Sequence, residues 1–108
     1  VYNNANAAIT ANNIAVWNGT TWSVLGATGT ANGVNGTVNA LAVNGNTLWV
    51  GGAFRQAYQS GTTLQVNNIV VWSGTAWSRL GTGNTLTGNG VSDIVNTIAI
   101  GSNGKVYV

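Results

Sequence analysis

Several residue types that carry chemistry are missing from this chain. Its 108 residues include no cysteine and no histidine, and Asp93 is the single acidic residue. Without cysteine there is neither a disulfide framework nor a thiolate metal site. Acid–base and nucleophilic catalysis usually require His, Cys or paired carboxylates, and calcium prefers several carboxylates. We therefore expect a chain that is not an enzyme and that uses no cofactor or metal.

Charge is equally scarce. Charged residues make up 4% of the chain, and the basic ones, Arg55, Arg79 and Lys105, stand far apart in the sequence. Binding to nucleic acid through counterion release needs clustered Lys or Arg, so we expect no nucleic-acid partner. Apolar runs are strand-sized, short of the roughly 20 residues that a membrane helix requires, so no membrane insertion is expected. Apolar residues nevertheless form 44% of the chain, which favours a packed structure.

The clearest positive feature is an internal repeat. The stretch NNIAVWNGTTWSVLG at 12–26 returns as NNIVVWSGTAWSRLG at 67–81, 55 residues later. A second pair of segments, VNALAVNGNTLWV from Val38 and VNTIAIGSNGKVYV from Val95, is offset by 57 residues. Periods of this size are typical of solenoids, arrays or propellers. The chain therefore holds about two repeats.

Within each repeat the pattern predicts strands. Short runs rich in β-branched and aromatic residues are bounded by Gly and Asn, and no stretch has helical periodicity. Both faces of the runs at 14–17 and 40–43 are apolar, so we expect these strands to be covered on both sides. Asn-Gly and Ser-Gly pairs supply the tight turns between strands.

The complete unit is predicted to be a four-stranded antiparallel meander. Its strands are expected at about 38–43, 47–51, 67–72 and 76–80, with half units at 13–25 and 95–108. Residues 1–37 then form the second half of one unit plus a connecting loop, 38–81 a complete unit, and 82–108 a loop plus the first half of the next. Gly51 and Gly52 are expected to allow close backbone approach or a bulge.

The motifs carry a family resemblance. LWVGGAF at 48–54, followed by the Trp hairpin at 67–81 and VNTIAI at 95–100, resembles the β-propeller repeats of bacterial and fungal surface proteins, which are akin to kelch and galactose-oxidase-type blades. The resemblance implies an all-β propeller segment of about two blades. Because propellers usually have about 4 to 8 blades, it is open unless other copies or a longer chain complete it.

The aromatic residues are assigned mainly to packing. Trp17 and Trp72 are expected in the core between neighbouring blades, whereas Trp22 and Trp77, in the outermost strand, are less clearly placed. Tyr58 is expected in an exposed loop spanning Arg55 to Val66. The loops at 27–37 and 82–94 differ in sequence while the strands repeat, which favours a scaffold over a binding protein with one site in each blade.

Three functions are compatible with these features. The first is a structural or adhesive module of a secreted surface protein, an extracellular fibre or a virion appendage. The second is a lectin-like propeller that binds glycans through its loops, with Tyr58, Arg55, Asn84 and Asn89 as possible ligand contacts. The third, an enzyme accessory domain, follows only from the family resemblance.

The expected partners follow from the phase of the repeat. The chain starts with the second half of a blade and finishes with the first half of another, so the two ends are complementary. Other copies of the chain, or further blades of a longer parent chain, are the expected partners, because open sheet edges invite pairing. The expected location is extracellular, at a cell surface or on a virion.

Overall fold

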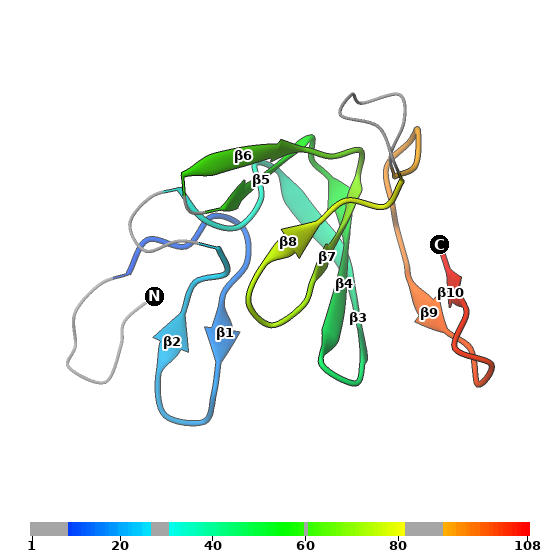
Figure 1. Cartoon of the computed structure of the whole chain (residues 1–108), viewed down its shortest axis with the longest axis horizontal. Helices are drawn as coiled ribbons and strands as arrows, with labels where there is room; N and C mark the ends of the chain where they lie inside the picture. The colour runs from blue at the N-terminus through cyan, green and yellow to red at the C-terminus, as the bar shows by residue number, and fades with distance from the viewer. Residues whose placement is uncertain (1–8, 27–30, 60, 82–89) are drawn as a thin grey trace.

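The computed structural model describes residues 9–26, 31–59, 61–81 and 90–108 (Figure 1). In these residues the fold is all-β and contains no helix. The ten strands are β1 (Val16–Trp17), β2 (Trp22–Ser23), β3 (Thr37–Asn44), β4 (Thr47–Ala53), β5 (Gln56–Gln59), β6 (Thr62–Gln65), β7 (Ile69–Trp72), β8 (Trp77–Ser78), β9 (Ala99–Ile100) and β10 (Val106–Tyr107).

An open antiparallel sheet of four strands occupies the middle of the molecule, in the order β3-β4-β7-β8. We call it the central sheet. Its strands correspond to the four that the sequence predicts for the complete unit. The N-terminal hairpin, β1–β2, and the C-terminal hairpin, β9–β10, lie on opposite sides of it (Figure 1). These hairpins form in the segments where the sequence predicts paired strands, at 13–25 and 95–108.

The segment after β4 differs from the prediction. The expected loop from Arg55 to Val66 is instead a β-hairpin, β5–β6, inserted between β4 and β7. We call it the crossing hairpin, since it runs across one end of the central sheet in Figure 1. Gly61, with φ of +71°, adopts the left-handed conformation at its turn. The hairpin is also anchored at its base, where the Val66 amide donates to the Arg55 carbonyl at 2.9 Å.

The two glycines of β4 allow close packing, as expected. A Cβ atom at Gly51 would lie 2.5 Å from Cγ1 of Val95, and one at Gly52 would lie 2.0 Å from the Thr37 carbonyl oxygen. The pairing of β3 with β4 also shifts register between Val38 and Ala40, which marks a bulge beside the glycines. A side chain at Gly51 would push Val95 away from the central sheet, and one at Gly52 would push β3 away from β4.

Apolar side chains pack against both faces of the central sheet. Because side chains alternate along a strand, Val70 joins a larger cluster on the face toward the N-terminal hairpin, while Ile69 joins a smaller cluster on the other face. The buried members of the larger cluster are Leu25, Val34, Val50, Phe54, Ala57, Val66, Val70 and Trp77. Those of the smaller cluster are Ile69, Val95 and Ile98.

The expected burial of the tryptophans is partly wrong. Trp17 is 50% exposed and Trp72 is half-buried, whereas Trp77, in the outermost strand, is only 3% exposed. Trp77 is covered because the crossing hairpin and the loop after β2 lie over it, and its indole Nε1 donates to the Leu25 carbonyl at 3.3 Å. No described element covers the outer side of Trp17.

The strands at 14–17 and 40–43 are likewise not covered on both sides. Ile14 packs against the larger cluster, but Val16 is 38% exposed. On β3, Ala40 and Ala42 pack against the smaller cluster, while the alternate side chains of Leu41 and Val43 are exposed. The apolar pattern of β3 therefore fits a strand packed on both faces, but the described residues cover only one.

Candidate functional site

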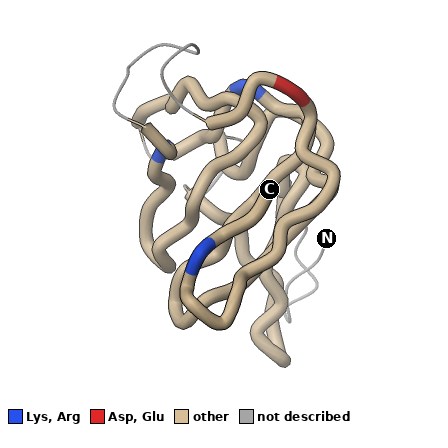
Figure 2. Tube along the Cα trace, turned by 90° about the vertical axis from the view of Figure 1, so that its right-hand side faces the viewer, with Lys and Arg blue, Asp and Glu red and all other residues tan. Residues whose placement is uncertain are grey.

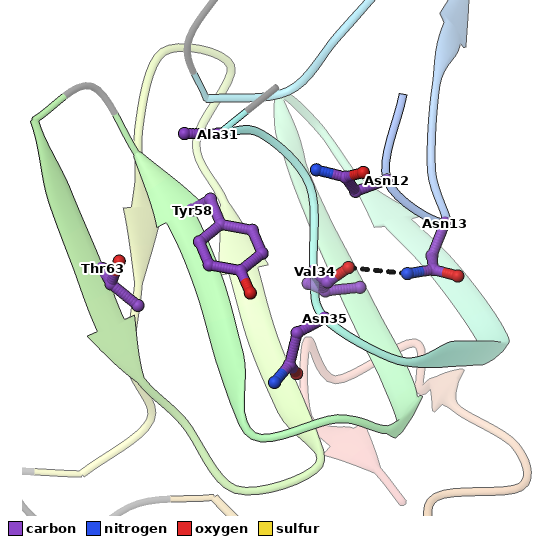
Figure 3. A pocket seen from close by; sticks show the side chains of 7 residues that line it. All are labelled: Asn12, Asn13, Ala31, Val34, Asn35, Tyr58 and Thr63. Carbon is purple, nitrogen blue, oxygen red and sulfur yellow. Dashed lines mark hydrogen bonds between the residues drawn. The ribbon is translucent and has the colours of Figure 1, made fainter. Parts of the chain in front are cut away.

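A hollow of about 470 Å³ lies beside the crossing hairpin. Figure 3 shows the Tyr58 ring beside Asn35, with Asn12 and Asn13 on the other side of the segment that carries Val34. Ala31 and Thr63 complete the lining. One aromatic ring among amides and a hydroxyl is a surface of the kind that sugars contact. Whether these polar groups are available to a ligand depends on the hydrogen bonds that they already form.

Tyr58 is positioned by β5 and is not in an exposed loop. Its amide donates to the Gly33 carbonyl at 2.8 Å, and the Asn35 amide donates to the Gln56 carbonyl at 3.0 Å. The segment around Val34 thereby lies along β5 as an additional, strand-like neighbour. The side chain of Tyr58 is half-buried, and its hydroxyl donates to Oε1 of Gln56 at 3.2 Å.

The Asn35 side chain is occupied by contacts within the protein. Its Oδ1 accepts from the backbone amides of Arg55 at 2.9 Å and Gln56 at 3.0 Å, and its Nδ2 donates to Oε1 of Gln56 at 3.3 Å. These bonds hold the start of β5 against the segment that carries Val34. The Asn35 side chain therefore stabilises the backbone that lines the hollow.

Asn12 and Asn13 are engaged in the same way. The Asn12 side chain donates to the Asn32 carbonyl at 3.0 Å, and the Asn12 amide donates to Oδ1 of the fully buried Asn32 at 3.1 Å. Asn13 has a left-handed backbone, with φ of 65°, and its Nδ2 donates to the Val34 carbonyl at 2.7 Å (Figure 3). Asparagine tolerates this conformation better than most residues.

We call the group Asn12, Asn13, Gly33 and Val34 the first clasp. In it, the Val34 amide donates to the Asn12 carbonyl at 3.2 Å and the Gly33 amide donates to the Leu25 carbonyl at 2.7 Å. The clasp ties the segment before β1, and Leu25 in the segment after β2, to the loop that leads into β3.

The second clasp, formed by Asn67, Asn68, Gly90 and Val91, repeats these contacts. Asn68 has φ of 63°, and its Nδ2 donates to the Val91 carbonyl at 3.2 Å. The Val91 amide donates to the Asn67 carbonyl at 2.9 Å, and the Gly90 amide donates to the Leu80 carbonyl at 2.6 Å. The loops at 27–37 and 82–94 are therefore alike where they meet the strands, contrary to the expectation that they simply differ. The signal in the sequence was the tripeptide Asn-Gly-Val, present at 32–34 and again at 89–91.

Of the other proposed contact residues, only Arg55 lies in the part of the chain that the structure describes. Arg55 is exposed at the start of the crossing hairpin and is not among the lining residues. Asn84 and Asn89 lie outside the described residues. Of the two that the structure describes, Tyr58 lines the hollow and Arg55 does not. The sequence did not point to Asn35 and Thr63, because an Asn-Gly pair and a Thr-rich stretch resemble ordinary turn sequence.

A second hollow of about 350 Å³ lies between the loop at 91–97 and Val108. Asp93 lines it, and its Oδ1 accepts from the Ile94 amide at 2.7 Å. A calcium ion takes about 6 to 8 oxygen ligands, usually from several carboxylates, and Asp93 supplies a single carboxylate. Figure 2 shows the basic residues at separate places along the chain, so they form no single positive patch.

Comparison with protein-family models, curated proteins and solved structures finds no match to this chain. Within the described residues there is also no helix long and apolar enough to cross a membrane.

Proposed function

We propose that this chain is a non-catalytic structural or adhesive module made of β-propeller blades, as found in a secreted surface protein, an extracellular fibre or a virion appendage. The central sheet is one blade, and the two hairpins are halves of its neighbours. Antiparallel sheets that pack face to face support this assignment, together with the likeness of the Trp hairpins to surface-protein propeller repeats.

The observation that carries the proposal is that the polar side chains around the hollow form hydrogen bonds within the protein. Around the hollow, Asn12, Asn13, Asn35 and Tyr58 all form hydrogen bonds within the protein. The fully buried Asn32, whose Oδ1 accepts from the Asn12 amide, belongs to the same network, and a buried polar group that is satisfied in this way specifies and rigidifies a fold. The second clasp repeats the first, as expected of residues that maintain a unit of architecture.

The composition agrees with a scaffold. No histidine, cysteine or glutamate is present to act as a general base, so a serine or threonine hydroxyl has none of the usual partners that activate it. The low charge leaves a surface of Asn, Thr, Ser and Gly, which can form hydrogen bonds with solvent or with a neutral surface. An adhesive role would use this broad polar surface in place of one deep site.

A saccharide titration followed by NMR tests the proposal against the lectin alternative. A panel of monosaccharides at millimolar concentration is added while the Tyr58 ring and the Thr63 amide are observed. A scaffold gives no saturable shifts, and hydrogen exchange shows strong protection of the Gly33 and Val34 amides in the first clasp. Saturable shifts that disappear in Tyr58→Ala would contradict the scaffold and favour a glycan site.

A further inference from the structure

The N-terminal hairpin has the geometry of one half of the central sheet. In β1–β2, Trp17 pairs with Trp22 and their ring centroids are 5.3 Å apart. In β7–β8, Trp72 pairs with Trp77 and the centroids are 5.0 Å apart. Hairpin β1–β2 is therefore structurally equivalent to β7–β8, but β1 lacks the neighbour that β4 provides to β7 among the described residues.

The C-terminal hairpin has the geometry of the other half. Ala99 pairs with Tyr107 as Ala42 pairs with Trp49, and the preceding pairs also correspond. Hairpin β9–β10 is thus equivalent to β3–β4, and in the part of the chain that the structure describes no strand pairs with β10 as β7 pairs with β4. Among these residues each hairpin has an edge of the kind that the other would fill.

Exposed apolar side chains lie beside this gap. Leu41 is 52% exposed, whereas its equivalent Ile98, the residue before β9, is 8% exposed because it packs against the central sheet. Val43 is 68% exposed. Leu41 is opposite the fully buried Val50, so the patch continues the same sheet face that forms the larger cluster. The patch has the position and chemistry of a blade interface with the neighbouring half-blade missing.

We propose that a second copy of this chain fills the gap with its C-terminal hairpin, so that β10 of one copy pairs with β1 of the next. This inference rests on the proposed blade architecture. The pairing of β4 with β7, in which Trp49 is opposite Val71 and Leu48 opposite Trp72, sets the register. Tyr107 of one copy then lies opposite Val16 of the next, and Val106 lies opposite Trp17.

The pairing accounts for the exposed side chains on both partners. Trp49 packs against the smaller cluster in the blade interface within the chain. Tyr107, its equivalent, is 53% exposed and in the composite blade faces the patch of Leu41 and Val43 on the next copy. The contact joins two different surfaces, so it is heterologous and produces a ring if the rotation closes and an open filament if it does not. A net charge of +2 per chain gives little repulsion between copies.

Disulfide cross-linking tests the register, because the wild-type chain contains no cysteine. Opposite Cα atoms of an antiparallel pair are about 4.5 to 5.5 Å apart, within the roughly 4.4 to 6.8 Å that a disulfide spans. Val16→Cys and Tyr107→Cys proteins are mixed and oxidised. We expect a cross-linked heterodimer between these two variants. Val16→Cys mixed with Ser102→Cys, in the exposed turn before β10, is the control and should cross-link far less.

A charge placed on the exposed patch tests the surface. Leu41→Lys alters a side chain that is already half exposed, so the single chain should still fold, but the lysine would be buried on assembly. Light scattering should find the wild type at a multiple of 11.0 kDa and Leu41→Lys at a single chain mass. Thr62→Lys, exposed on the crossing hairpin, adds the same charge away from both edges and should keep the wild-type mass.

Three results would overturn the inference. A folded monomer at high concentration would show that the edges do not pair between copies, while leaving the non-catalytic scaffold intact. Oligomers that survive Leu41→Lys and do not cross-link in the expected pair would place the contact elsewhere. An unfolded or irregularly aggregating chain would show that a second copy does not complete the fold. The saccharide titration reports on the scaffold separately.

Discussion

Hairpins β1–β2 and β7–β8 share almost the same sequence and shape but differ in burial. Trp77 is 3% exposed and Trp22 is half-buried, while Trp17 is 50% exposed and Trp72 is half-buried. Local sequence thus sets the turn and the Trp–Trp contact, since both occur twice. The depth of burial depends on the neighbours, because β7 is paired to β4 and the crossing hairpin lies over β8.

The largest expected difference between the two hairpins is at their second tryptophan. Trp77→Ala should lower the free energy of unfolding by about 3 to 5 kcal/mol, because it empties a buried site in the larger cluster. Trp22→Ala should cost about 1 kcal/mol, as is usual for a point substitution outside the core. Urea denaturation of the two variants measures both values. Equal losses would mean that the two hairpins are equally buried in solution.

The clasps should behave alike in spite of the different burial around them. Gly33 and Gly90 have φ of +68° and +70°, and a Cβ at either would lie 2.2 Å from an asparagine carbonyl oxygen. Replacement by alanine should cost about 2 to 4 kcal/mol, from the left-handed backbone and the clash together. Gly45→Ala, at φ of +62° with open space around its Cβ position, should show only the backbone cost of about 1 to 2 kcal/mol. If all three variants lose the same stability in thermal denaturation, close packing in the clasps is unimportant.

The asparagine side chains provide a smaller contrast. Asn68 is 2% exposed and Asn13 is exposed, yet both donate to an equivalent carbonyl. Glycine accepts the same backbone conformation, so Asn→Gly removes mainly the side-chain hydrogen bond. We expect Asn68→Gly to cost about 1 to 3 kcal/mol and Asn13→Gly about 0.5 to 1 kcal/mol, because water can replace the exposed bond. Chemical denaturation measures the free energy of unfolding of both variants. A greater loss of stability in Asn13→Gly than in Asn68→Gly would contradict the assigned burial.

The smallest effect is expected at Tyr58, whose hydroxyl forms one hydrogen bond at the hollow. Tyr58→Phe removes the bond from its hydroxyl to Gln56 and should cost about 0.5 kcal/mol, near the lower end for a net hydrogen bond. Thermal denaturation at matched concentration would detect the change. A loss of more than about 2 kcal/mol would mean that the hydroxyl satisfies a buried group.

The sequence predicts the strands of the central sheet well, because its turn residues and repeated runs are local signals. It does not predict the crossing hairpin, whose polar strands, Gln56–Gln59 and Thr62–Gln65, have little apolar alternation. The burial of individual side chains is harder to predict than the strands, since Trp17 and Trp72 have the same local sequence pattern and differ only in what lies beside them. At the hollow, the sequence pointed to Tyr58 but not to the hydrogen bond of its amide with Gly33, because Gly33 is distant from it in the sequence.

The division of the core by the central sheet has a consequence for how the chain unfolds. The smaller cluster has three buried members and holds the C-terminal hairpin, whereas the larger one holds everything on the other face. Regions with few buried apolar contacts open at lower free energy than the rest of a protein. We therefore expect the C-terminal hairpin of a single chain to detach first, while the larger cluster remains intact.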